Sequence, residues 1–116
     1  MQSAIDRATL LARLDNDWEL LRELVELFLK GLPNSLASLR DAIARQDAHA
    51  LGRAAHKLKG EIGNFTTLGA YGTLAKLEAM GCQGELSDAG GDFRCLEKET
   101  QDLALNLQSL AESVTQ

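Results

Sequence analysis

The apolar residues of this chain recur at alternating steps of four and three residues, which is the spacing of one face of an α-helix. Between residues 49 and 65 this stripe is formed by Leu51, Ala55, Leu58, Ile62 and Phe65. Near the C-terminus a longer stripe is formed by Phe93, Leu96, Thr100, Leu103, Leu107, Leu110 and Val114. Convincing two-residue alternation, the mark of a half-buried strand, is absent. The sequence therefore predicts an all-α fold.

Capping residues and glycines divide the chain into helices. The expected helices span about residues 6–14, 17–30, 33–45, 47–65, 66–80 and 92–114. Their starts carry residues suited to capping or to the first turn, namely Asp15, Asn16, Asp17, Pro33, Asp47, Thr66, Thr67 and Asp92. Gly31 and a glycine-rich loop over 81–91 would separate neighbouring helices. Short connections favour antiparallel neighbours, so we expect an antiparallel four-helix bundle with a short additional N-terminal helix, in a single domain over residues 1–116.

Composition and charge exclude several classes of function. The formal net charge of -5 and the pI near 4.9 argue against a nucleic-acid partner. No apolar run approaches the roughly 20 residues that span a bilayer, and the segment from Met1 to Asp6 lacks the features of a secretory signal. Cys82 and Cys95 are interpreted as two reduced thiols, so a cytoplasmic location without membrane contact is expected.

The helix over 49–65 carries one histidine on its outer side. When Leu58 is set at zero on a helical projection, His56 falls at about 160°, almost opposite the apolar stripe. Gly52, Gly60 and Gly63 fall at about 120°, 200° and 140°, in the same outer sector. Because a glycine inside a helix costs about 0.5–1 kcal/mol relative to alanine, three of them here need a reason. One reason is close approach of another protein to the imidazole, and the alternative is tight packing of Gly60 and Gly63 against a helix of the same fold.

The surroundings of His56 suit phosphoryl transfer. A neutral imidazole nitrogen is nucleophilic near neutral pH without a base to deprotonate it. Lys59, three residues further on, lies within reach as a positive charge for phosphate oxygens, and Arg53 and Lys57 add to the local positive field. His49 lacks flanking glycines and is interpreted as a solvated surface residue.

The run from Ala55 to Gly60, Ala-His-Lys-Leu-Lys-Gly, resembles the A-H-x-L-K-G signature of histidine phosphotransfer (HPt) domains, and Gly63-Asn64-Phe65 extends the match. Other segments similar to the family in order and spacing extend the resemblance over about residues 5–112. The resemblance implies that His56 is the phospho-acceptor and that Lys59 stabilises the phosphate. It also implies that Gly60 and Gly63, which lack side chains, allow a partner domain to approach the helix surface closely.

The resemblance also implies partners and cofactors. HPt domains exchange phosphoryl groups with the aspartate of response-regulator receiver domains, and the divalent metal belongs to the receiver, so no cofactor or metal is expected on this chain. Gly52, Arg53, Lys57, Gly60 and Gly63 are the expected partner-binding residues. We expect a monomeric phosphorelay intermediate without autonomous kinase activity, either free-standing or the C-terminal module of a hybrid sensor histidine kinase whose parent protein could be anchored in the inner membrane.

Two residues depart from the family pattern. Glu61 stands where most members have Ser or Ala, and Thr66 stands where many have Gly. Glu61 is placed to pair with Lys57 one turn earlier and to repel an incoming phosphate slightly. These departures bear on partner preference and transfer rate.

Three other interpretations remain open at the level of sequence. One is a phospho-accepting substrate domain of a chemotaxis-type kinase, whose donor would be a histidine kinase catalytic domain. Another is a non-catalytic helical adaptor in which His56 is incidental. The weakest is a metal-binding bundle, because His49 and His56 lie about 10 Å apart along the helix.

Overall fold

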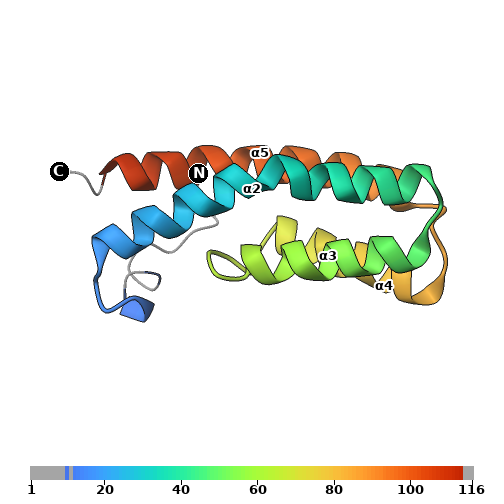
Figure 1. Ribbon diagram of the computed structural model, residues 1–116, viewed down its shortest axis with the longest axis horizontal. Coiled ribbons are helices and arrows are strands. Elements are labelled where there is room, and N and C mark those ends of the chain that lie inside the picture. Colours follow the sequence, from blue (N-terminus) through green and yellow to red (C-terminus); the bar gives the residue numbers. More distant parts are fainter. Residues whose placement is uncertain (1–9, 11, 114–116) are drawn as a thin grey trace.

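The computed structural model describes residue 10 and residues 12–113. Four long helices account for most of them: α2 (Trp18–Ala44), α3 (Ala48–Ile62), α4 (Ala70–Gln83) and α5 (Ala89–Ser113). No strand occurs in this part of the chain. Figure 1 shows α2 and α5 side by side along the long axis of a molecule 46 Å in length, with α3 and α4 as an antiparallel pair beneath them. Each helix packs on two others, in the order α2, α3, α4, α5 and back to α2.

The prediction of an all-α, antiparallel four-helix bundle is confirmed. The short additional helix expected over residues 6–14 falls mostly outside the described residues, among which Leu10, Ala12 and Arg13 are helical. Val114, expected at the end of the last apolar stripe, also lies outside them. No helix in the described part is long and apolar enough to cross a membrane.

The core is built from the apolar stripes that the spacing predicts. On α3 the buried residues are Leu51, Ala55, Leu58 and Ile62, and Phe65 is buried just beyond the helix end, where its ring lies 5.2 Å from that of Phe28. On α5 the buried part of the predicted stripe is Phe93, Leu96, Thr100, Leu103 and Leu107. Fully burying one such large side chain contributes about 1.5–3 kcal/mol, so these two stripes supply much of the stability of the bundle.

The expected break between helices at Gly31 and Pro33 is wrong, because α2 continues through both residues. Its buried residues, Leu21, Val25, Leu32, Leu39 and Ala42, are spaced so that one face stays turned inward across the proline. A proline inside a helix costs about 3 kcal/mol, and burial of the apolar side chains on both sides offsets this cost. Figure 1 shows the two halves of α2 at different inclinations, as expected where a proline removes a backbone hydrogen bond.

The ends of α3, α4 and α5 differ from expectation by a few residues. Asp47 caps α3 as predicted, and its carboxylate accepts from the Ala50 amide, but the helix ends at Ile62 rather than Phe65. The cap of α4 is Gly69 instead of Thr66 or Thr67. The predicted loop over 81–91 is shorter in the structure and spans residues 84–88. Helix α4 ends at Gln83 and is capped by Gly84, whose φ of 73° favours glycine, and α5 begins at Ala89, ahead of the expected cap Asp92.

A close approach of α3 and α4 occurs at a pair of glycines. A Cβ atom built on Gly81 would lie 2.5 Å from the Gly52 nitrogen, 2.6 Å from its Cα and 2.7 Å from the Ala48 carbonyl oxygen. All three are backbone atoms of α3, which cannot turn away as a side chain can. Gly81 therefore lets the two helices pack closely at this point, and Gly52 lies on the other side of the same contact.

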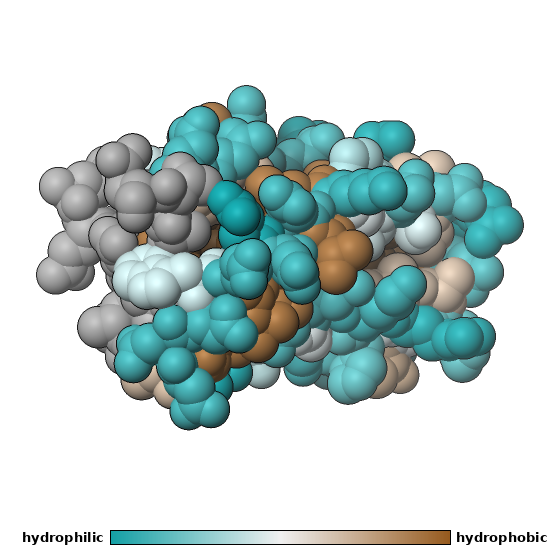
Figure 2. All heavy atoms as spheres, turned by 60° about the vertical axis from the view of Figure 1, so that its left-hand side comes forward, coloured by the Kyte–Doolittle hydropathy of each residue, from teal (hydrophilic) through white to brown (hydrophobic). Residues whose placement is uncertain are grey.

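The surface of the bundle is not uniformly polar. Five large apolar side chains remain exposed among the described residues: Trp18, Leu20, Leu27, Leu68 and Leu105. Figure 2 shows apolar surface between polar side chains on one face of the molecule. Exposed apolar side chains that are scattered singly are normal on folded domains, so these residues alone do not define a contact site.

The glycine contact can be tested by substitution. Gly81→Ala should lower the free energy of unfolding by about 1–3 kcal/mol, because the added methyl group forces α3 and α4 apart. Gly72→Ala is the matched control on α4, since a Cβ at Gly72 meets no atom within 4 Å. The control should be neutral or stabilising by up to about 1 kcal/mol. Urea denaturation measures both, and equal stability of the two variants would contradict the proposed packing.

Candidate functional site

The side chain of His56 projects from the outer face of α3. It is 71% exposed, whereas its neighbours on the inner face, Ala55 and Leu58, are fully buried. The outward orientation expected from the helical projection is therefore confirmed. The backbone of α3 is anchored by its apolar stripe, so the helix presents the imidazole to solvent without exposing the core.

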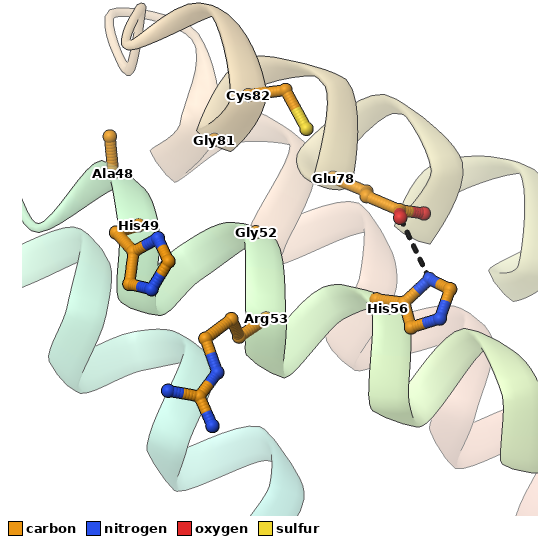
Figure 3. Close-up of a pocket in the computed structure, with 8 residues that line it drawn as sticks. All are labelled: Ala48, His49, Gly52, Arg53, His56, Glu78, Gly81 and Cys82. Carbon is orange, nitrogen blue, oxygen red and sulfur yellow. Dashed lines mark hydrogen bonds and ion pairs between the residues drawn. The ribbon is translucent and has the colours of Figure 1, made fainter.

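One ring nitrogen of His56 is held by a residue of another helix. The His56 Nδ1 atom lies 2.8 Å from Oε2 of Glu78, which comes from α4 (Figure 3). An ionised carboxylate only accepts hydrogen bonds, so the proton of this bond is assigned to Nδ1. This leaves the lone pair on Nε2, the nitrogen that does not contact Glu78.

The same carboxylate binds Lys59. The Lys59 Nζ atom donates to Glu78 Oε1 over 2.6 Å, and both side chains are only 23% exposed. The ammonium group also lies 5.8 Å from the centre of the Tyr71 ring, a favourable position for a cation. Glu78 thus bridges His56 and Lys59, and it uses a different oxygen atom for each.

The bridge shifts the ionisation of its members. The pKa of Glu78 is lowered by the hydrogen bond from Lys59, to which the bond from His56 adds, against the opposing effect of partial burial. The hydrogen bond to Glu78 raises the pKa of Lys59. The carboxylate and the ammonium group are therefore both charged at neutral pH, and the site contains one negative and one positive fixed charge.

The three glycines of the outer sector have different surroundings. Gly60 is exposed, and a Cβ built on it would meet no atom within 4 Å. A Cβ on Gly63 would lie 3.2 Å from the Tyr71 ring, and one on Gly52 would lie 3.7 Å from the Gly81 backbone. Gly52 and Gly63 face α4, where they allow close packing. Gly60 makes no such contact and leaves the helix surface open to solvent. The expectation that all three are turned to solvent is corrected accordingly.

The remaining residues near the site are polar and exposed. Arg53, Lys57 and His49 are all exposed on α3. Glu61 forms no ion pair with Lys57 within the described part of the chain. An open groove beside His56 runs between α3 and α4 and is lined by Ala48, His49, Gly52, Arg53, Glu78, Gly81 and Cys82 (Figure 3).

Two cysteines and several acidic residues are possible metal ligands among the described residues. Cys82 and Cys95 are both free and exposed. Among the described residues, no three His, Cys, Asp or Glu side chains gather closely enough to hold a metal ion.

Glu78 is the site residue that reasoning from the sequence missed. It lies 22 positions from His56 and directly follows the buried Leu77, so its own helix gives no sign of a partner on α3. The contact depends on the relative placement of α3 and α4, and this is set by tertiary packing. A glutamate that follows a buried leucine is common at the edge of the buried face of a helix, so the sequence does not single out Glu78.

A helical bundle that exposes one oriented imidazole beside a lysine has the features of a protein that carries a group on histidine. The family model for the Hpt domain matches residues 23–112, and the chain belongs to this family. A histidine phosphotransfer role in a phosphorelay follows, and Hpt domains interact with response-regulator receiver domains in such relays.

A solved structure supports the fold. The crystal structure of histidine-containing phosphotransfer protein B (HptB) from Pseudomonas aeruginosa PAO1 resembles this chain with a TM-score of 0.88 and 23% sequence identity, over 97% of this chain and 98% of that one. At this identity the likeness concerns the fold. Comparison with curated proteins found no match.

The ionic bridge predicts a pH-dependent effect of Glu78→Gln on stability. Because the folded-state pKa of Glu78 lies below its usual value of 4.5, its stabilisation is present above about pH 4.5 and is lost as the pH falls through the lowered value. The variant should therefore be less stable than the parent at neutral pH, and the difference should be smaller at a pH well below 4.5.

Urea denaturation at both pH values measures this difference. Glu97→Gln serves as the control, because Glu97 is an exposed residue of α5 whose carboxylate makes no ion pair with a described residue. It should change stability little at either pH. A Glu78→Gln deficit that is equal at both pH values would show that the charge of Glu78 does not stabilise the fold.

Proposed function

We propose that this chain is a phosphorelay intermediate that accepts a phosphoryl group on Nε2 of His56 from the aspartyl phosphate of a receiver domain and passes it to the aspartate of another receiver. The observation that carries the proposal is the exposed imidazole whose Nδ1 is fixed by Glu78. A ring held at one nitrogen and open at the other is prepared for attack in one direction.

The proposed transfer balances in atoms and charge. The Nε2 lone pair attacks phosphorus, the P–O bond to the receiver aspartate breaks, and the aspartate leaves as a carboxylate. The ring keeps its Nδ1 proton and becomes positively charged, and the carboxylate of Glu78 stabilises that charge. No proton has to leave the imidazole before attack, so the chain needs no separate general base.

Lys59 is the proposed partner of the phosphoryl oxygens. It lies one helical turn from His56, and its ammonium group already reaches the carboxylate that binds the ring. The transferring group carries charge on its outer oxygens, and nearby cations stabilise it. The divalent metal that assists transfer is proposed to come from the receiver, so this chain contributes the nucleophile and the positive charge.

The partner is proposed to dock over the exposed side of α3. Arg53, Lys57 and Gly60 are exposed there, and Gly60 allows a close approach beside the imidazole. A basic surface on a domain with a net charge of -5 favours an acidic partner surface. Gly52 and Gly63 are proposed to contribute indirectly, since both permit the close packing of α3 and α4 that positions Glu78.

The test is phosphoryl transfer from a labelled phosphorylated receiver domain to variants of the chain. His56→Gln should abolish uptake of the label, because the nucleophilic nitrogen is lost. His49→Gln is the matched control, since His49 is another exposed histidine of α3, and it should accept the label like the parent.

The donor is identified in a parallel incubation with a histidine kinase catalytic domain and ATP. We expect the phosphorylated receiver to label the chain. Labelling by the kinase domain alone would instead support the substrate domain of a chemotaxis-type kinase. Uptake of label by His56→Gln at the parental level would contradict the proposed acceptor.

A further inference from the structure

The charge balance at the site has a consequence for how firmly the phosphoryl group is held. Lys59 is the only cation bound to Glu78 besides the imidazole among the described residues, and Glu78 is its only ion-pair partner there. The Nζ–Oε1 distance of 2.6 Å is that of a strong, charge-assisted hydrogen bond. Without a phosphoryl group, the charge of Lys59 is therefore already compensated.

We infer that Glu78 competes with the phosphoryl group for Lys59, and thereby keeps phosphohistidine at position 56 short-lived and ready for onward transfer. The inference rests on the proposed phosphorylation of His56. It makes Glu78 a positioning residue that acts on the stored phosphoryl group through Lys59.

The competition follows from the two bonds of a single carboxylate. Glu78 Oε2 accepts from His56, and Glu78 Oε1 accepts from Lys59, so the ammonium group and the ring are tied to the same anchor. A phosphoryl group on Nε2 brings additional negative charge into a site whose fixed charges already cancel. Lys59 can compensate that charge fully only if it leaves Glu78. The carboxylate then stays hydrogen-bonded to the positively charged ring through Nδ1, but its own negative charge repels the phosphoryl group.

Partial burial strengthens the competition. Both Lys59 and Glu78 are 23% exposed, so the pair is less screened than a fully exposed pair on the surface. The centre of the Tyr71 ring lies 5.8 Å from the ammonium group and adds a favourable neighbour for the cation. The exchange of partners is therefore a local choice between Glu78 and the phosphoryl oxygens.

The effect on lifetime can be written as a reaction. In hydrolysis, water attacks phosphorus, the N–P bond breaks, its electron pair returns to Nε2, and inorganic phosphate leaves while the Nδ1 proton stays on the ring. A group that stabilises the phosphorylated ground state more than the transition state of hydrolysis slows this loss. A lysine released from Glu78 is such a group, whereas a lysine bound to Glu78 is less effective.

Glu78→Gln separates the charge from the hydrogen bond. The amide oxygen of glutamine can still accept from Nδ1, but it carries no charge with which to retain Lys59. We expect the half-life of the phosphohistidine to lengthen roughly 3- to 10-fold, as expected when one unit charge a few ångströms away is removed at the surface of a protein. Glu97→Gln, the control on α5, should have the parental half-life.

The experiment uses the whole chain and a small phosphoramidate as donor, so that no receiver is required. After removal of the donor, the decay of the phosphohistidine is followed by phosphorus NMR in the parent, Glu78→Gln, Lys59→Ala and the double variant. If Glu78 acts through Lys59, Glu78→Gln lengthens the half-life with lysine present and has a much smaller effect in the Lys59→Ala background. An equal or shorter half-life in Glu78→Gln, or the same lengthening in both backgrounds, overturns the inference.

A second measurement needs no variant. The nitrogen NMR signal of the Lys59 ammonium group should move when the parent chain is phosphorylated, because the group changes its hydrogen-bond partner, and an unchanged signal contradicts the exchange. Failure of the underlying proposal is distinguishable from failure of this inference. Failure of a phosphorylated receiver domain to label His56 in every variant overturns both, whereas phosphorylated chains with equal half-lives overturn only the role of Glu78.

Discussion

The close contact between α3 and α4 is the constraint on which the rest of the site depends. Gly81 lies against the backbone of Gly52 and Ala48, at distances that no side chain larger than hydrogen would allow. That contact fixes the separation of the two helices. Glu78 lies one turn before Gly81 on α4, and its Oε2 atom is 2.8 Å from Nδ1 of His56. The apolar stripe of α3 supplies the other half of the constraint, because burial of Leu58 on one side of the helix turns His56 outward on the other.

A single carboxylate serves two basic groups of the site. The carboxylate of Glu78 orients the imidazole of His56 through Nδ1 and also compensates the charge of Lys59. A nucleophile prepared in this way needs little rearrangement before attack, which is the advantage of a preorganised site. The charge of Lys59 is thus already compensated before a phosphoryl group arrives, and this suits a protein that passes the group on. Membership of the Hpt family agrees with a histidine phosphotransfer role for this site.

The sequence predicts the parts of this structure that depend on local periodicity. The buried faces of α3 and α5 and the outward direction of His56 follow from residue spacing alone, and Asp47 is recognisable as a cap. Features that depend on tertiary packing are not predictable in this way. Pro33 is a helix breaker in isolation, yet α2 continues through it because its apolar face remains buried on both sides. The glycine at position 52 marks an intramolecular contact, and Glu78 becomes a site residue only once α4 lies beside α3.

The most direct test of the account is the position of phosphorus on the ring of His56. Nitrogen-15 and phosphorus NMR of the phosphorylated chain would show which nitrogen is coupled to phosphorus and which carries a proton. We expect coupling of phosphorus to Nε2 of His56, with the proton retained on Nδ1. Coupling to Nδ1, or to a nitrogen of His49, would contradict the arrangement in which Glu78 holds one nitrogen and leaves the other for transfer.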